Sequence, residues 1–282
     1  MTSRTARLRA LYAFVTAALC LLALATPARA DDGTSAPPRA APLARALPRA
    51  FGSYDALLKT ASAVASDQAT LYAQLVAVQA EHDLAKTILA SVVDPHIRGG
   101  LVHTETNVSD EPALSALRAE IAVSGAAKAQ LLSGGAADVP PALTWQRPLA
   151  GGVSQPFGPT YLGLEPARLY HGTFYWHFHD GVDIIASAGT PILAPARGRV
   201  VFAGRMADGA MVVALAHDNG LVSLYAHLQE GPLAPTIKAG DIVGAGDRIG
   251  AVGLTGLTTG YHLHWAVYKN GEPIDPVGTL GG

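Results

Sequence analysis

The segment from Tyr54 to about Val93 carries the most regular hydrophobic pattern of the chain. Mostly apolar or small residues recur there with alternating steps of four and three, at Leu57, Ala61, Val64, Gln68, Leu71, Leu75, Val78, His82, Ala85, Leu89 and Val92. This spacing places them on one face of a helix. The sequence therefore predicts one long helix with a single buried stripe.

A second helical pattern follows a clear break. Asp94-Pro95 and Gly99-Gly100 end the first pattern, because proline and glycine disfavour a continued helix. The pattern after Ser109 consists of Leu114, Leu117 and Ile121 on one face and Leu131 near its end. We expect a coiled-coil-like helical hairpin over residues 51–135, either simply packed or serving as a spacer or lid.

After Gly134-Gly135 and Pro140-Pro141, the helical patterns give way to short β-rich runs separated by glycine. The runs that we expect to be strands are 198–203, 211–216, 221–227, 248–252 and 262–268. Asn219-Gly220 and Asn270-Gly271 predict hairpin turns, because Asn-Gly readily adopts the positive φ angles of a type I′ turn. The sequence thus predicts an α+β chain, with a mainly antiparallel β domain over residues 143–282 after the helical hairpin.

The first thirty residues have the features of an export signal. Three of the first nine residues are arginines, an apolar run follows from Leu11 to Ala25, and Ala28-Arg29-Ala30 supplies a small-residue cleavage site. The run is shorter than the ~20 residues that span a bilayer, so cleavage is favoured over a retained membrane anchor. We therefore expect a signal peptide at 1–30, a flexible linker at 31–50, and a secreted or cell-envelope protein without a transmembrane segment after signal removal.

The composition limits which residues can bind a metal and which partners the chain can have. The single cysteine, Cys20, lies in the expected signal, so a metal in the exported chain must be held by His, Asp or Glu. The chain has 20 Lys+Arg against 22 Asp+Glu, and removal of four signal arginines leaves 16 against 22, a net charge of -6. This acidic balance argues against a nucleic-acid partner.

Histidines concentrate in the expected β domain, which holds seven of the ten. His262 and His264 open an expected strand, and residues i and i+2 of a strand share one face. His179 and Asp183 lie four apart around Gly181, which we expect to let a loop turn sharply. Together they could give Zn²⁺ two nitrogens and one oxygen, with a fourth position left for water, as in catalytic zinc sites.

Three further histidines allow alternative interpretations. His227 ends an expected strand and could lean over a neighbouring site. His177 is also two residues from His179 and could contact zinc or substrate, but only His179 has Asp183 at the motif spacing. His217, just before the Asn219-Gly220 turn, is interpreted as a structural turn residue.

The order of these motifs resembles the M23 or LytM-like zinc metallopeptidases. An HxxxD motif at 179–183, YAHL at 225–228 and HLH at 262–264 occur in sequence, with Gly189-Thr190-Pro191 between the first two. The resemblance covers roughly residues 145–280. Tyr261 departs from the usual pattern, where proline commonly precedes HLH, and Trp265-Ala266 replaces the frequent Phe-Glu.

The resemblance implies both ligands and mechanism. His179, Asp183 and His264 are expected to bind Zn²⁺, while His227 and His262 act as catalytic histidines. Zinc-activated water would then hydrolyse peptide bonds of peptidoglycan. The spacing leaves open which histidine is the general base.

Two other function classes remain. A non-catalytic LytM-like regulator would bind and activate another cell-wall hydrolase, and the helical hairpin could dock such an envelope protein. In this family, that role is associated with loss of zinc ligands. Here all three expected zinc ligands are retained, which argues against it. A structural spacer stiffened by metal would need no pair of additional histidines. The sequence therefore favours a zinc metalloendopeptidase acting on peptidoglycan peptides.

Overall fold

The computed structural model describes residues 47–98, 111–133 and 145–280. The predicted signal peptide and nearly all of the predicted linker lie outside these residues. Within the described part of the chain, no helix combines the length and the apolar character needed to cross a membrane.

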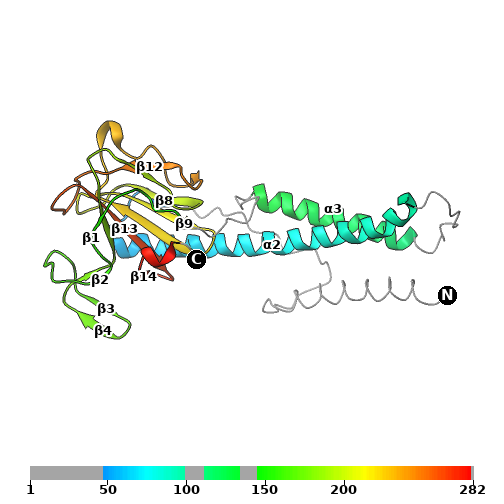
Figure 1. Ribbon diagram of the computed structural model, residues 1–282, viewed down its shortest axis with the longest axis horizontal. Coiled ribbons are helices and arrows are strands. Elements are labelled where there is room, and N and C mark those ends of the chain that lie inside the picture. The colour runs from blue at the N-terminus through cyan, green and yellow to red at the C-terminus, as the bar shows by residue number, and fades with distance from the viewer. Residues whose placement is uncertain (1–46, 99–110, 134–144, 281–282) are drawn as a thin grey trace. The chain divides into compact units, whose positions relative to one another are not determined.

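Two helices precede the β-rich part, α2 (Tyr54–Arg98) and α3 (Glu111–Ser133), and they pack against each other (Figure 1). Ser53 caps the start of α2, because its Oγ accepts a hydrogen bond from the Ala56 N–H at 3.2 Å. Leu71, Leu75 and Leu131 form the buried contact between the helices. The predicted helical hairpin is confirmed.

The stripe of α2 has two partners along its length. Its first part packs on the β-sheet, where Leu57, Ala61 and Val64 join the buried residues of four strands. Its later part contacts α3, through Leu71 and Leu75. One periodic pattern in the sequence therefore serves two different interfaces, which periodicity alone does not distinguish.

The β-rich part is a mainly antiparallel arrangement, as predicted. Its strands are β1 (Val153–Gln155), β2 (Gly158–Pro159), β3 (Arg168–Tyr170), β4 (Thr173–Tyr175), β5 (Phe178–His179), β6 (Gly181–Ile185), β7 (Pro191–Leu193), β8 (Gly198–Arg205), β9 (Met211–His217), β10 (Leu221–Ala226), β11 (Ile242–Val243), β12 (Arg248–Ala251), β13 (His262–Lys269) and β14 (Glu272–Ile274), with short 3₁₀ turns at Gly231–Leu233 and Val277–Thr279. The five expected strand runs correspond to β8, β9, β10, β12 and β13.

One sheet organises this part of the chain. Its strand order is β1-β6-β13-β10-β9-β8-β11, and β14 pairs with the end of β13. The two-stranded pairs β7–β12, β2–β5 and β3–β4 accompany it. β13 pairs with β6 on one side and with β10 on the other, so it lies within the sheet and not at its edge.

The two faces of the sheet differ in side-chain size. On β13, Leu263, Trp265 and Val267 point into one hydrophobic core, whereas Ala266 and Tyr268 belong to the core under α2. The face under α2 is rich in alanine, at Ala210, Ala214, Ala216, Ala226 and Ala266. Small side chains allow the helix to approach the sheet closely. Since alternate residues share a face, His262 and His264 lie on this α2-covered face.

The two Asn-Gly turns differ. At the β13–β14 turn both Asn270 and Gly271 have positive φ, 54° and 85°, as a type I′ turn requires. At the β9–β10 turn only Gly220 has a positive φ, 80°, so the expected type I′ geometry is wrong there.

The division into a hairpin at 51–135 and a peptidase domain at 143–282 stays a prediction. The start of α2 packs on the sheet, so the two parts are in contact.

Candidate active site

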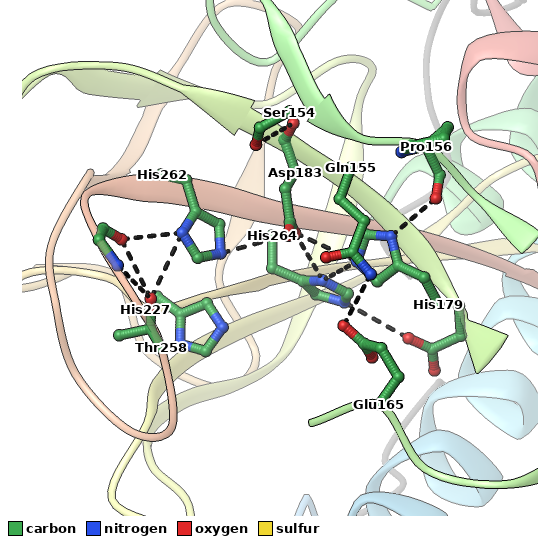
Figure 2. Close-up of polar contacts among 12 residues, drawn as sticks. Ser154, Gln155, Pro156, Glu165, His179, Asp183, His227, Thr258, His262 and His264 are labelled. Carbon is green, nitrogen blue, oxygen red and sulfur yellow. Dashed lines mark hydrogen bonds and ion pairs between the residues drawn. The ribbon is translucent and has the colours of Figure 1, made fainter. Parts of the chain in front are cut away.

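Three side chains converge at one edge of the α2-covered face (Figure 2). His179 Nε2 lies 3.0 Å from His264 Nδ1. Asp183 Oδ1 lies 3.2 Å from His179 Nε2 and 3.1 Å from His264 Nδ1. These are the three residues that the sequence suggested as metal ligands, and they form a cluster able to hold a metal ion.

Neighbouring strands bring the cluster together. His179 ends β5, Asp183 lies within β6, and His264 of β13 pairs directly with Asp183. Gly181, expected to turn a loop, instead begins strand β6. A Cβ there would stand 2.6 Å from the Trp265 carbonyl oxygen and 2.9 Å from the His264 ring. The glycine is therefore required by close packing and not by a sharp turn.

Hydrogen bonds on the far side of each ring determine which nitrogen faces the cluster. His179 Nδ1 donates to the Pro156 carbonyl at 3.0 Å (Figure 2). His264 Nε2 lies 3.5 Å from Asp180 Oδ1. With protons on those nitrogens, His179 Nε2 and His264 Nδ1 turn lone pairs toward each other and toward Asp183, an arrangement that a bound cation stabilises.

The donor set fits zinc. Ligand atoms about 2.0–2.2 Å from a tetrahedral Zn²⁺ stand about 3.3 Å apart, close to the 3.0–3.2 Å observed between the three donor atoms. Two imidazole nitrogens and one carboxylate oxygen are also the ligand types of catalytic zinc sites. The assignment of His179, Asp183 and His264 as ligands stays a prediction that this geometry supports.

The charges of the cluster are strongly coupled. Burial would raise the pKa of Asp183, but His179 and His264 outweigh it and hold that pKa well below its usual range. Burial would lower the pKa of His264, yet Asp180 and Asp183 raise it to about 10. A positive charge is thus stabilised at this position.

The two expected catalytic histidines flank the cluster. Their ring centroids are 4.9 Å apart, and His262 Nε2 lies 3.5 Å from Asp183 Oδ1 (Figure 2). His262 Nδ1 donates to the Gly260 carbonyl at 2.8 Å, and His227 Nδ1 donates to the Thr255 carbonyl at 2.8 Å. In the neutral form of each ring, these bonds place the proton on Nδ1 and leave Nε2 as the acceptor. Both carbonyls belong to the loop 253–260, which we call the positioning loop.

His227 has an unusual backbone. Its φ is +60°, a left-handed value that residues other than glycine rarely adopt. The Gly253 N–H donates to its carbonyl at 2.9 Å, so the positioning loop holds both the main chain and the side chain of this residue. Such backbone outliers persist where the surroundings impose them and are frequent at functional sites. Burial lowers the pKa of His227 to about 4, which favours the neutral ring.

A groove of about 720 Å³ runs past the cluster. The positioning loop lines it with Leu257, Thr258 and Thr259, and residues 162 and 164–169 line another part. Tyr54, Asp55 and Leu58 of α2 also line it. The start of the helical hairpin thus forms part of the wall of this groove.

His177 and His217, for which the sequence left other roles open, lie outside the cluster. His177 Nδ1 bonds the Glu165 carbonyl at 2.8 Å. His217 is buried, donates to the Arg197 carbonyl and accepts from Ser223, at 2.8 and 2.7 Å. His217 therefore has a structural role, as the sequence suggested. It acts through a buried hydrogen-bond network and not through the turn.

Sequence reasoning missed the groups that orient the imidazoles. The carbonyls of Pro156, Thr255 and Gly260 belong to the main chain, so no residue type marks them. Asp180 could have been noticed, since it is a carboxylate directly after His179 within the motif.

Comparison with known proteins supports the resemblance to the M23 peptidases. The profile of peptidase family M23 matches residues 177–276. The DD-carboxypeptidase/endopeptidase Mpg of Neisseria meningitidis serogroup B is 38% identical over 125 residues, which are 44% of this chain and 26% of that protein. Peptidoglycan DD-endopeptidase ShyC of Vibrio cholerae is 36% identical over 113 residues, 40% of this chain and 25% of that protein. The chain thus spans about a quarter of the length of these curated relatives.

Solved structures match about half of the chain. The catalytic domain of lysostaphin from Staphylococcus simulans is 30% identical and matches 47% of this chain and 93% of that chain, with a TM-score of 0.39. Helicobacter pylori Csd3 is 34% identical, with 49% and 35% covered and a TM-score of 0.39.

Proposed function

We propose that this chain, whose residues 177–276 match the profile of peptidase family M23, is an exported zinc metalloendopeptidase that hydrolyses peptide bonds of peptidoglycan. The observation that carries the proposal is the convergence of His179, Asp183 and His264, with 3.0–3.2 Å between their donor atoms. The two additional imidazoles beside the cluster indicate catalysis, because a purely structural metal site does not need them.

Each residue then has a definite task. His179, Asp183 and His264 would hold the zinc ion, which when bound supplies a Lewis acid that lowers the pKa of water to ~7 and polarises the scissile carbonyl. His227 and His262 line the groove beside the cluster. One of them takes the proton from the attacking water.

The substrate is inferred from the relatives and from the groove. ShyC is named a peptidoglycan DD-endopeptidase and Mpg a DD-carboxypeptidase/endopeptidase, and an exported chain would meet the cell wall. A groove of about 720 Å³ is in the size range of small-ligand sites, roughly 300–1,000 Å³, which suits a short stem peptide.

One observation favours the non-catalytic regulator as a second candidate. Tyr54, Asp55 and Leu58 of α2 line the groove, so the helical hairpin is placed where it could limit access or respond to a partner envelope protein. The intact set of three donors favours the peptidase.

Replacing His264 by alanine tests the proposal. We expect residues 31–282 to bind about one zinc ion and to release new amino groups from purified sacculi, and His264→Ala to lose both properties because two donors hold zinc weakly. Zinc content by elemental analysis and amine labelling of digests are the measurements. His171→Ala, which changes an exposed histidine, is the matched control and should behave like the wild type.

Three outcomes separate the function classes. Turnover of sacculi by metal-free protein would contradict the mechanism. Zinc binding without turnover, together with stimulation of another hydrolase, would favour the regulator. Mass spectrometry of fragments from defined muropeptides would then identify the bond that is cut.

A further inference from the structure

Asp180 is a carboxylate beside the metal cluster that takes no part in the proposed ligand set. Its Oδ2 accepts a hydrogen bond from the Tyr268 hydroxyl at 2.6 Å and one from Arg168 Nη2 at 3.3 Å. Its other oxygen, Oδ1, lies 3.5 Å from His264 Nε2. Two donors therefore hold one oxygen in place while the second faces the imidazole of His264.

The position of Asp180 follows from the strand pairing. His264, Ala266 and Tyr268 alternate along one face of β13, and Gly181 pairs with Ala266. Asp180 immediately precedes Gly181, so its carboxylate reaches both His264 and Tyr268 across the small side chain of Ala266. A Cβ at position 181 would stand 2.9 Å from the His264 ring, so the glycine allows this close approach.

The two nitrogens of His264 face different groups. Nδ1 lies 3.1 Å from Asp183 Oδ1 and 3.0 Å from His179 Nε2, within the cluster. Nε2 lies on the opposite side of the ring, toward Asp180. A neutral imidazole carries one proton, and the nitrogen that accepts a metal must lack it.

We propose that Asp180 is a positioning residue for the zinc site, which fixes the proton of His264 on Nε2 and so leaves Nδ1 free to bind the metal. The inference rests on the proposed function, because it concerns the same site. Carboxylates that hold the second nitrogen of a metal-binding histidine increase its basicity and fix its orientation, and their loss typically lowers metal affinity 10–100-fold. Asp180 cannot itself be a ligand in this arrangement, since the imidazole ring stands between it and the cluster.

The first experiment measures zinc affinity of the full chain by competition with a chromogenic chelator. Asp180→Asn keeps the size of the side chain but removes its charge, and we expect zinc affinity to fall about 10–100-fold. Asp218→Asn is the control: Asp218 is likewise an aspartate paired with an arginine, Arg197 at 2.6 Å, but it lies outside the cluster. Its loss should change zinc affinity less than twofold.

A double-mutant cycle distinguishes positioning from general damage to the fold. Tyr268→Phe removes only the hydroxyl that holds Asp180, so we expect it to weaken zinc binding several-fold in the wild type and to have no further effect in Asp180→Asn. Independent effects of the two substitutions on zinc affinity would overturn the proposal.

The outcomes also separate this inference from the proposed function. If the wild type binds about one zinc ion and Asp180→Asn binds it equally well, the positioning role is wrong and the peptidase proposal stands. If the wild type binds no zinc, both fall. A selective loss of affinity in Asp180→Asn, with Asp218→Asn unchanged, supports both.

Discussion

The four imidazoles at the site are oriented by different kinds of group. Main-chain carbonyls of Pro156, Thr255 and Gly260 accept from Nδ1 of three of the rings, whereas His264 has the Asp180 carboxylate on the side of its ring away from the cluster. Each contact sets which nitrogen is free, and the free nitrogen decides whether a histidine can bind metal or accept a proton. The residue types were evident in the sequence, but the tautomers depend on partners that carry no sequence signal.

The two proposed catalytic histidines should be separable from the ligands. His227→Ala and His262→Ala each leave the three donors in place, so both variants should keep about one zinc ion while turnover of sacculi falls about 10²–10⁴-fold, the usual contribution of a general acid or base. Zinc content and amine release from the same samples are the measurements. Loss of zinc in either variant would mean that the ligand assignment is wrong.

His217 should make stability depend on pH. Burial lowers its pKa from 6.5 to about 4, so the unfolded chain takes up a proton between these values while the folded chain does not. Above about pH 6.5, His217 is neutral in both states and does not lower the free energy of unfolding. As the pH drops to 4, protonation of the unfolded chain lowers that free energy by up to about 3 kcal/mol.

Chemical unfolding of the zinc-loaded protein at pH 4 to 7.5 measures this effect. His227 titrates in the same range, so the difference in slope between the wild type and His217→Gln reports on His217 alone. Equal slopes for the two proteins would contradict the prediction.

At the scale of elements, α2 belongs both to a helical hairpin and to the packing of the sheet. The periodicity of its sequence predicted a helix and a buried stripe, and both are present. It did not show that Leu57, Ala61 and Val64 would contact the sheet and Leu71 would contact α3. Periodicity identifies the buried face of a helix but not the element that packs against it.

Leu57→Ala should reveal the importance of this contact. Leu57 is fully buried between α2 and the sheet, and truncation of a buried leucine costs about 2–5 kcal/mol of unfolding free energy. Leu84→Ala, on the same helix at a half-exposed position, is the control and should change it by less than about 0.5 kcal/mol. Chemical denaturation measures both. Comparable small losses would show that α2 packs on the sheet only weakly.

The strand pattern was predictable where strands are long and apolar, as in β8, β9, β10 and β13. β6, which carries Asp183, was expected to be a loop because its motif contains a glycine. The structure shows that Gly181 is needed for the approach of the Trp265 carbonyl and the His264 ring. A single sequence does not distinguish a glycine that turns from a glycine that makes room.

At the scale of the whole molecule, the candidate metal site links separate parts of the chain. Its donors come from β5, β6 and β13, and 81 residues separate Asp183 from His264. A bound ion would therefore connect distant segments, and its binding energy would add to the stability of the fold.

Zinc should raise the thermal stability of the metal-free protein. Free zinc at 100 times its dissociation constant adds about 2.7 kcal/mol to the free energy of unfolding, and the melting temperature should rise accordingly in calorimetry. His264→Ala should show no such rise. An equal increase in both proteins would point to zinc bound elsewhere.

The positioning loop has an evolutionary consequence. It orients both proposed catalytic imidazoles through the carbonyls of Thr255 and Gly260, and a carbonyl is present whatever the side chain. Leu257 and Thr259 line the groove, so substitutions at these two positions could change substrate preference without altering the chemistry. A deletion or insertion of one residue would displace both carbonyls at once. Loop length is therefore constrained, and so are Gly253 and Gly256, where a Cβ would stand 2.5 and 2.6 Å from neighbouring atoms.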